Sequence, residues 1–204
     1  MRRTHWVLAL VVALLVGGGY YILTHQRAKA PTHATSPTTI SSITTDTMST
    51  TLTLHSPAFA HEGVIPSKYT CNGDNVNPPL AIEGIPYDTA SLALIVDDPD
   101  IPESVAERLG KGEFDHWVVF NIPPTQTRIG EGDAPEGMQG ANSADSAQYT
   151  GPCPPDGEHR YLFKLFALDT MLDLAEGATK EEVLGAIEGH VLDSTTLMGR
   201  YTRQ

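Results

Sequence analysis

The chain has 204 residues, enough for one domain with additional sequence but few for two. Its formal net charge is -12, and the first fifty residues hold four bases and one acid, so residues 51–204 hold nine bases and twenty-four acids, a charge of -15. Such an acidic surface repels polyphosphates, which argues against DNA or RNA as a partner, and it opposes broad adhesion to anionic lipid. A single small anion in a local pocket is compatible with this charge, because distant charges are screened.

The amino terminus has the pattern of an export signal. Residues 1–3 contain two arginines, and an apolar run covers residues 6–23. This run of about 18 residues is close to the length of a bilayer span, while residues 28–30 (AKA) offer a cleavage pattern. We therefore interpret residues 1–30 as a hydrophobic helix that serves as a signal anchor or as a signal peptide. Both interpretations place the domain outside the cytoplasm, in the periplasm or extracellular space, either anchored in the membrane or secreted.

Residues 31–50 are rich in Thr, Ser and Pro and contain few apolar side chains. Such a segment cannot bury enough surface to offset its ordering entropy, so we expect a flexible linker. The domain would then comprise residues 51–204.

The apolar segments of this domain are mostly short and typical of strands. Residues 51–54 alternate, residues 91–96 (SLALIV) are apolar on both faces like a central strand, and aromatic or β-branched residues dominate two further runs. The predicted strands are 51–54, 91–96, 116–122, 161–168 and, more weakly, 195–201. Trp117 and Phe120 are predicted to lie in the core.

One helix is predicted after a capping box at residues 179–182 (TKEE), with Val183, Leu184, Ile187 and Val191 on one face. Loops rich in Pro and Gly separate the strands. Strands without regular helix alternation predict a mainly β fold, a β-sandwich with a few peripheral helices.

Acids and histidines gather at three predicted strand ends. Residues 97–100 (DDPD) end the most hydrophobic strand, residues 115–116 (DH) begin another, and residues 151–161 (GPCPPDGEHRY) lead into a third. Strand ends meet at one edge of a sandwich, so these side chains could share one place. Two chemical interpretations are open at this point: a divalent metal site, or an anion pocket in which a carboxylate orients a protonated histidine. A third is purely structural, since such acids often cap turns.

Five segments occur in an order that is similar to a known family. They are residues 68–73 with 77–80 (KYTCNG, NPPL), 98–102 (DPDIP), 115–123 (DHWVVFNIP), 151–152 with 159–161 (GP, HRY), and 195–201 (TTLMGRY). Together they resemble the phosphatidylethanolamine-binding family, and the first and last resemble its bacterial, Raf kinase inhibitor-like branch. The resemblance covers nearly the whole of residues 51–204.

The resemblance implies a β-sandwich with a small pocket for phosphate-like anions, including phospholipid headgroups. The residues that it places in the pocket are Asp98, Asp100, His116, Gly151, Pro152, His159 and Tyr161. The histidines and loop amides would meet the phosphate, an acid would face an ammonium or hold an imidazole, and the tyrosine would donate its hydroxyl. The chain departs from the family pattern in the long charged segment 101–114, which could alter access to the pocket or form a short helix, and at residues 144–145.

The two cysteines, Cys71 and Cys153, do not form a C-x-x-C motif. An exported chain favours a disulfide between them, and the resembling bacterial branch often has cysteines at both places. Two buried free thiols are the alternative.

The leading hypothesis is an anion- or headgroup-binding module that modulates a protein partner outside the cytoplasm, because family members regulate kinases or inhibit proteases. No G-x-S-x-G elbow is present, so the sequence gives little support to a serine hydrolase. We expect no catalytic residue, metal or cofactor. The rival hypothesis is a metal-dependent phosphoesterase or other hydrolase that uses Asp98, Asp100, His116 and His159. A structural envelope protein with a vestigial pocket is the third.

Overall fold

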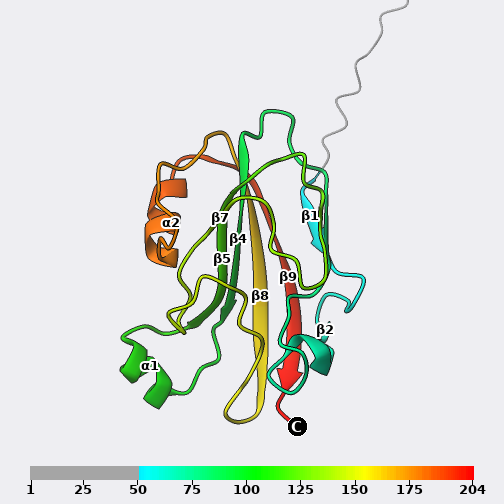
Figure 1. The fold of residues 1–204 in the computed structure, drawn as a ribbon, viewed down its shortest axis with the longest axis vertical. Helices are drawn as coiled ribbons and strands as arrows, with labels where there is room; N and C mark the ends of the chain where they lie inside the picture. The colour runs from blue at the N-terminus through cyan, green and yellow to red at the C-terminus, as the bar shows by residue number, and fades with distance from the viewer. Residues whose placement is uncertain (1–50) are drawn as a thin grey trace, which may run out of the picture. The chain divides into compact units, whose positions relative to one another are not determined.

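Two β-sheets pack face to face. The structure, a computed structural model, describes residues 51–204. The large sheet has the strand order β2-β9-β8-β4-β5-β7 and the small sheet the order β1-β3-β6 (Figure 1). The large sheet contains β2 (Gly63–Val64), β4 (Ser91–Asp98), β5 (Phe114–Ile122), β7 (Met138–Gln139), β8 (Glu158–Leu168) and β9 (Val191–Thr202). The small sheet contains β1 (Thr53–His55), β3 (Leu80–Glu83) and β6 (Arg128–Ile129).

Strand β4 lies at the centre of the large sheet. It pairs antiparallel with β5 on one side and β8 on the other, and all eight of its residues are buried. The prediction of a strand covered on both faces is therefore confirmed. Its last two residues, Asp97 and Asp98, are 1% and 3% exposed, so the strand carries two carboxylates into the interior.

Alternate residues of the central strands supply two separate cores. Leu94 of β4 packs between the sheets with Leu54 and Ile82 of the small sheet. Its neighbour Ile95 faces the other side, where it packs with Val118 beneath a helix. This alternation is the expected period of two along a strand. The mainly β sandwich predicted from the sequence is confirmed.

Helix α2 (Lys180–Ile187) covers the outer face of the large sheet (Figure 1). The predicted capping box is confirmed: Thr179 accepts a hydrogen bond from the Glu182 backbone N–H, and the Glu182 carboxylate accepts one from the Thr179 N–H at 2.8 Å. Val183 and Ile187 are buried against the sheet as predicted.

The predicted apolar face of this helix was wrong at two positions. Leu184 is 39% exposed, and Val191 is not helical but begins β9. The helix ends at Ile187, and Gly189 has a positive φ of 82°, so the chain turns before the next helical repeat could form.

Other boundaries differ modestly from the predicted ones. Strand β1 begins at Thr53 rather than at residue 51, and β9 pairs with β8 over nearly its whole length, although only residues 195–201 were predicted. Within the charged segment 101–114, residues Glu103–Leu109 form a short helix, α1. A 3-10 turn, η1 (Ser67–Tyr69), precedes β3.

The predicted signal segment (residues 1–30) and linker (residues 31–50) lie outside the described residues. Across residues 51–204, no helix is both long and apolar enough to span a bilayer.

A buried ion network lies on the outer side of the large sheet, between β4, β5 and α2. Lys180, whose side chain is 3% exposed, lies 2.5 Å from an oxygen of Asp115 and 3.7 Å from Asp97, and it also pairs with Glu113. Lys164 of β8 donates to Asp97 at 2.8 Å. Burial disfavours a charged ammonium, but the neighbouring carboxylates outweigh this effect and raise the pKa of Lys180.

Candidate functional site

A cavity of about 230 Å³ lies between α1, the end of β4, the start of β5 and the loop that follows residue 149. Its polar wall contains Asp98, His116 and Gly151, three of the seven ligand-binding residues predicted from the sequence. The remaining lining residues are Ile101, Pro102, Val105, Arg108, Phe114, Thr150, Cys153 and Pro155.

Asp98 and His159 form a buried pair beside this cavity. The Nδ1 of His159 lies 2.7 Å from Oδ2 of Asp98, and both side chains are 4% exposed. The other carboxylate oxygen, Oδ1, accepts the backbone N–H of Asp100 at 2.8 Å. Both oxygens of Asp98 are therefore engaged within the protein, and the carboxylate fixes the orientation of the imidazole.

His116 presents one free ring nitrogen to the cavity that it lines. Its Nδ1 lies 2.6 Å from the carbonyl oxygen of Thr150, which can only accept, so Nδ1 carries the proton and donates. Only Nε2 is then left for a ligand. Burial lowers the pKa of His116 from its usual value, an effect larger than the opposing charges of Asp98 and Asp115, which favours a neutral ring before a ligand binds.

Tyr161 packs behind His116 rather than lining the cavity. The two ring centroids are 5.2 Å apart in an edge-on arrangement, and the tyrosine is fully buried. Its hydroxyl makes no hydrogen bond that satisfies normal geometry, although it lies close enough to Asp98 for that charge, added to burial, to raise the pKa of the tyrosine. Tyr161 therefore packs against the imidazole of His116 without lining the cavity.

The loop at Gly151 is held by its neighbours on the side away from the cavity. The Gly151 N–H donates to Oδ1 of Asn75 at 2.8 Å, and a Cβ at this position would lie 2.6 Å from the same oxygen and closer still to the Tyr69 carbonyl. Only a glycine fits this close approach. Pro152 lies outside the cavity lining, and its carbonyl accepts the Cys71 N–H at 3.1 Å.

Within residues 151–155, one backbone N–H is left for the predicted role of the loop amides in anion binding. Three of the residues in the segment 151–155 are prolines, which have no N–H, and the Gly151 N–H is already used. The N–H of Cys153 has no hydrogen-bond acceptor among residues 51–204.

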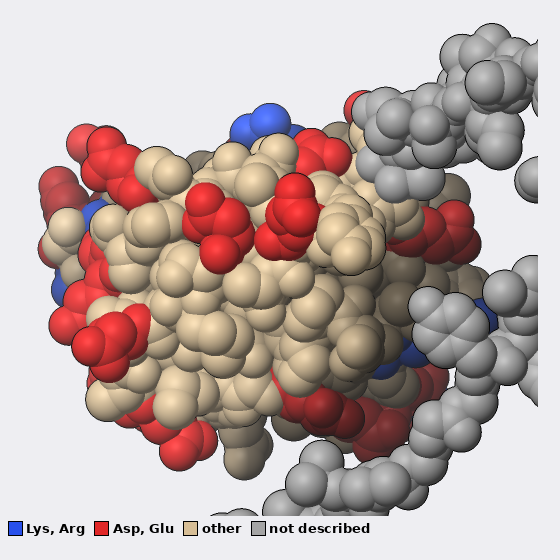
Figure 2. Space-filling view, turned by 90° about the horizontal axis from the view of Figure 1, so that it is seen from above, with Lys and Arg blue, Asp and Glu red and all other residues tan. Residues whose placement is uncertain are grey.

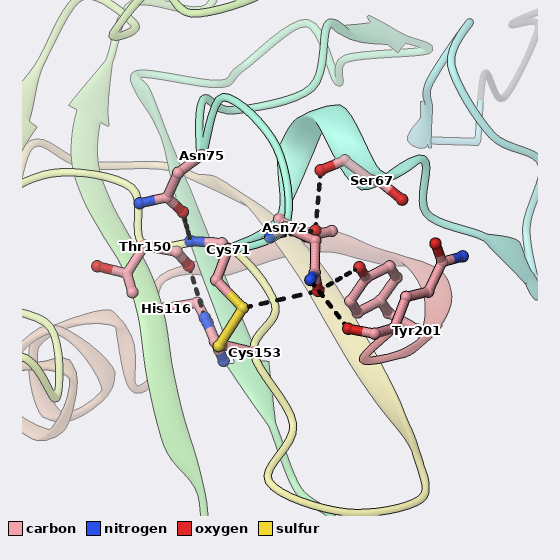
Figure 3. Close-up of a disulfide and its surroundings, with 11 residues drawn as sticks. Ser67, Cys71, Asn72, Asn75, His116, Thr150, Cys153 and Tyr201 are labelled. Carbon is pink, nitrogen blue, oxygen red and sulfur yellow. Dashed lines mark hydrogen bonds between the residues drawn. A yellow bond between two sulfur atoms is a disulfide. The ribbon is translucent and has the colours of Figure 1, made fainter.

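A disulfide joins Cys71 and Cys153 (Figure 3), with the two sulfur atoms 2.14 Å apart and the two Cα atoms 5.4 Å apart. Because Cys153 lines the cavity, the bond attaches the cavity loop to the segment that follows η1. Asn72, next to Cys71, accepts the hydroxyl of Tyr201 at 2.8 Å, which ties this segment to β9.

Asp100 does not line the cavity. Its carboxylate accepts two hydrogen bonds from one edge of the Arg160 guanidinium, Oδ2 from Nε at 2.8 Å and Oδ1 from a terminal nitrogen at 2.6 Å. These hydrogen bonds lower the pKa of Asp100. The role of Asp100 is therefore to fasten the end of β4 to β8.

Reasoning from sequence missed three features of the site. Asp115, quoted with His116 as one motif, belongs to the buried ion network on the opposite side of the sheet, since neighbouring strand residues face opposite ways. Arg108 of α1 lines the cavity, although its segment was noted only as a departure. Thr150, whose carbonyl orients His116, had no sequence signal beyond its position beside Gly151.

Two further observations bear on alternative sites. A larger cleft of about 740 Å³ is lined by Trp117, Tyr149 and surrounding loops, and it contains none of the seven predicted residues. Among residues 51–204, no three His, Cys, Asp or Glu side chains are grouped so that they could hold a metal ion.

Known proteins match both the sequence and this fold. A UPF0098 protein of Methanothermobacter thermautotrophicus is 50% identical over 158 residues, which covers 74% of this chain and 99% of that protein. A UPF0098 protein of Chlamydia muridarum is 45% identical over 150 residues, 74% of this chain and 98% of the relative.

Two solved structures align with the fold of this chain. The crystal structure of CT736, a putative phosphatidylethanolamine-binding protein homolog from Chlamydia trachomatis, aligns with a TM-score of 0.73 at 42% identity and covers 76% of this chain and all of that one. The structure of YbcL from E. coli, described as a member of the mammalian PEBP family, aligns with a TM-score of 0.67 at 26% identity over 75% of this chain and 99% of that one. The phosphatidylethanolamine-binding protein family model matches residues 55–202. The chain therefore belongs to the phosphatidylethanolamine-binding protein family.

Proposed function

We propose that this protein binds a phosphate-type anion in the 230 Å³ cavity and does so without chemical turnover. One observation carries the proposal: Nδ1 of His116 is occupied by the Thr150 carbonyl, so Nε2 is the nitrogen free to donate to an anion once protonated. The Asp98–His159 pair supports absence of turnover, because both carboxylate oxygens are already engaged and none is free to act as a base.

Isothermal titration with inorganic phosphate tests the binding site. Replacing His116 removes a hydrogen bond to a charged group, and such bonds contribute about 1.5–3 kcal/mol, so His116→Ala should weaken binding by roughly 10–100-fold. His190→Ala is the matched control, because His190 is 47% exposed and pairs with Asp169 away from the cavity. Equal affinities for the wild type and His116→Ala would refute the site.

Turnover is tested on the same samples. Phosphate esters incubated with the protein and with Mg²⁺, Mn²⁺ or Zn²⁺ should release no phosphate above the level of His116→Ala. Metal-dependent release that is lost in His159→Ala would establish the rival phosphoesterase instead.

We also propose that the domain acts outside the cytoplasm and modulates a protein partner there. The export pattern of residues 1–30 and the Cys71–Cys153 disulfide support this location, because disulfides persist in oxidising compartments. Protease should degrade the domain in cells whose outer envelope has been permeabilised and whose cytoplasmic membrane is intact. Protection of the domain until the cells are lysed would contradict the location.

A functional partner should be captured by the wild type and released when phosphate is added.

A further inference from the structure

The cavity wall that faces His116 comes from the segment 101–114, and it is mostly apolar. Ile101, Pro102 and Val105 line the cavity from this side, and Phe114 lines it at the start of β5. The centroids of the Phe114 and His116 rings are 4.7 Å apart, so the imidazole lies beside an apolar ring. A ligand held by His116 would therefore have apolar side chains around any part of it that extends beyond the anion.

The charged side chains at the cavity differ in whether they are already paired within the protein. Asp98 is engaged by His159 and by the Asp100 backbone, and Asp100 itself is paired with Arg160, so neither acid is free to receive an ammonium group. In contrast, Arg108 is exposed to solvent, lines the cavity and makes no ion pair with any residue of the described domain. Arg108 is therefore a permanent cation at the cavity that is left unpaired within the described domain, whereas Asp98 and Asp100 are both paired.

Helix α1 is held over the cavity by ion pairs at both of its ends. Asp100 and Arg160 fix the chain before the helix, while Lys111, just after it, pairs with the buried Asp115. The helix itself buries no residue, so these end contacts determine where it lies. These contacts place the backbone of Arg108 beside the cavity before a ligand arrives.

The volume of the cavity exceeds what inorganic phosphate needs. At about 30 Å³ for each water-sized group, the five heavy atoms of inorganic phosphate take up at most roughly 150 Å³ of the 230 Å³. The remaining space lies among apolar side chains.

We propose that the cavity selects a small phosphomonoester whose substituent is apolar, with Arg108 as a second anion contact opposite His116. The proposal rests on the function proposed above and specifies its ligand class. A phosphomonoester has three terminal oxygens and a charge of about -1.5 to -2 at neutral pH. Two side-chain donors line the cavity for these oxygens: the Arg108 guanidinium and Nε2 of His116 when protonated. Cys153, whose backbone N–H has no acceptor among residues 51–204, lines the same cavity. A zwitterionic headgroup would place its ammonium near Arg108 without a free acid.

Titration calorimetry with three probes tests this selectivity. Phenyl phosphate should bind the wild type about tenfold or more tightly than inorganic phosphate, because its ring leaves water for apolar walls. Phosphorylethanolamine should bind no more tightly than inorganic phosphate. Arg108→Gln should weaken phenyl phosphate roughly tenfold, as expected for the loss of a charge-assisted hydrogen bond. Arg128→Gln, which changes an exposed arginine of β6, should leave all three affinities unchanged.

The outcomes separate this proposal from the one on which it rests. If none of the probes binds the wild type, the anion-binding function itself fails. If inorganic phosphate binds but phenyl phosphate gains nothing, or if Arg108→Gln behaves like Arg128→Gln, anion binding stands and the selectivity proposal is overturned. Tighter binding of phosphorylethanolamine than of phenyl phosphate would also overturn it, in favour of a headgroup ligand.

Discussion

At the scale of single residues, the site depends on the alternation of side chains along β4 and β5. Asp98 and His116 face the cavity, whereas their chain neighbours Asp97 and Asp115 face the ion network on the other side of the sheet. Two adjacent acids therefore have different roles: Asp98 orients an imidazole, and Asp97 balances lysines. Burial raises the pKa of Asp97, and the neighbouring Lys164 opposes this shift.

The state of His116 predicts how affinity depends on pH. Burial holds its pKa below the usual value of 6.5, and a bound anion would raise it, so binding takes up a proton. Sulfate affinity should therefore increase as the pH falls from about 7.5 to 5.5, by at most roughly tenfold per pH unit for one proton. Sulfate is a suitable probe because it does not titrate in this range. Calorimetry of His116→Gln should show a flat profile, and a flat profile in the wild type would contradict the prediction.

Replacing Gly151 or Gly185 with alanine should change the stability of the domain in opposite directions. In Gly151→Ala the new methyl group would meet the Asn75 side chain and the Tyr69 carbonyl, which should lower the free energy of unfolding by about 1–3 kcal/mol. Gly185→Ala, in α2 with open space around it, should instead raise it by about 0.5–1 kcal/mol. Urea denaturation of both variants measures this, and a stable Gly151→Ala protein would show that the loop can shift.

At the scale of elements, the ion network connects the two helices to the sheet. Lys111 follows α1 and Lys180 begins α2, and both lysines pair with Asp115 in the middle. Asp115 therefore connects the segment after α1, which lies over the cavity, with the start of α2.

Removing the central lysine should be strongly destabilising. Lys180→Met keeps most of the side-chain volume but leaves Asp97 and Asp115 buried with fewer partners, and breaking a buried ion pair in this way costs about 3–5 kcal/mol. Lys68→Met, which breaks an exposed pair with Glu131, should change stability little. Equal urea midpoints for the two variants would mean that the network contributes little.

At the scale of the whole molecule, the domain is strongly acidic, and one covalent bond links distant segments. Asp and Glu side chains are spread over the end of the domain seen in Figure 2, with few Lys or Arg among them. This distribution fits the charge of the sequence and leaves anion binding to the donors that line the cavity.

Reduction of the disulfide should destabilise the domain. The bond closes a loop with a sequence separation of 82, for which chain entropy predicts a contribution of roughly 4.5 kcal/mol. Urea unfolding with and without reductant, and of the Cys71→Ser/Cys153→Ser double variant, should show this loss. Because Cys153 lines the cavity, phosphate affinity should fall as well. Unchanged midpoints would indicate that the rest of the fold already restrains these segments.

Local patterns in the sequence determined most of the elements. Apolar runs of strand length predicted β4, β5 and β8, and the capping box at Thr179 fixed the start of α2. These signals are readable because they act between residues close in the chain. The end of α2 was misjudged, since a turn at Gly189 interrupts an apolar pattern that otherwise continues.

The motifs also located the candidate site, but only the tertiary structure assigned its members. Whether Asp98 is free or engaged depends on His159, 61 positions away, and whether Asp100 is free depends on Arg160, 60 positions away. Arg108 lines the cavity on α1, whose flanking residues pair with side chains of β5 and β8. The sequence determines which residue types are present and their local periodicity, whereas long-range contacts decide which of their polar atoms are left for a ligand.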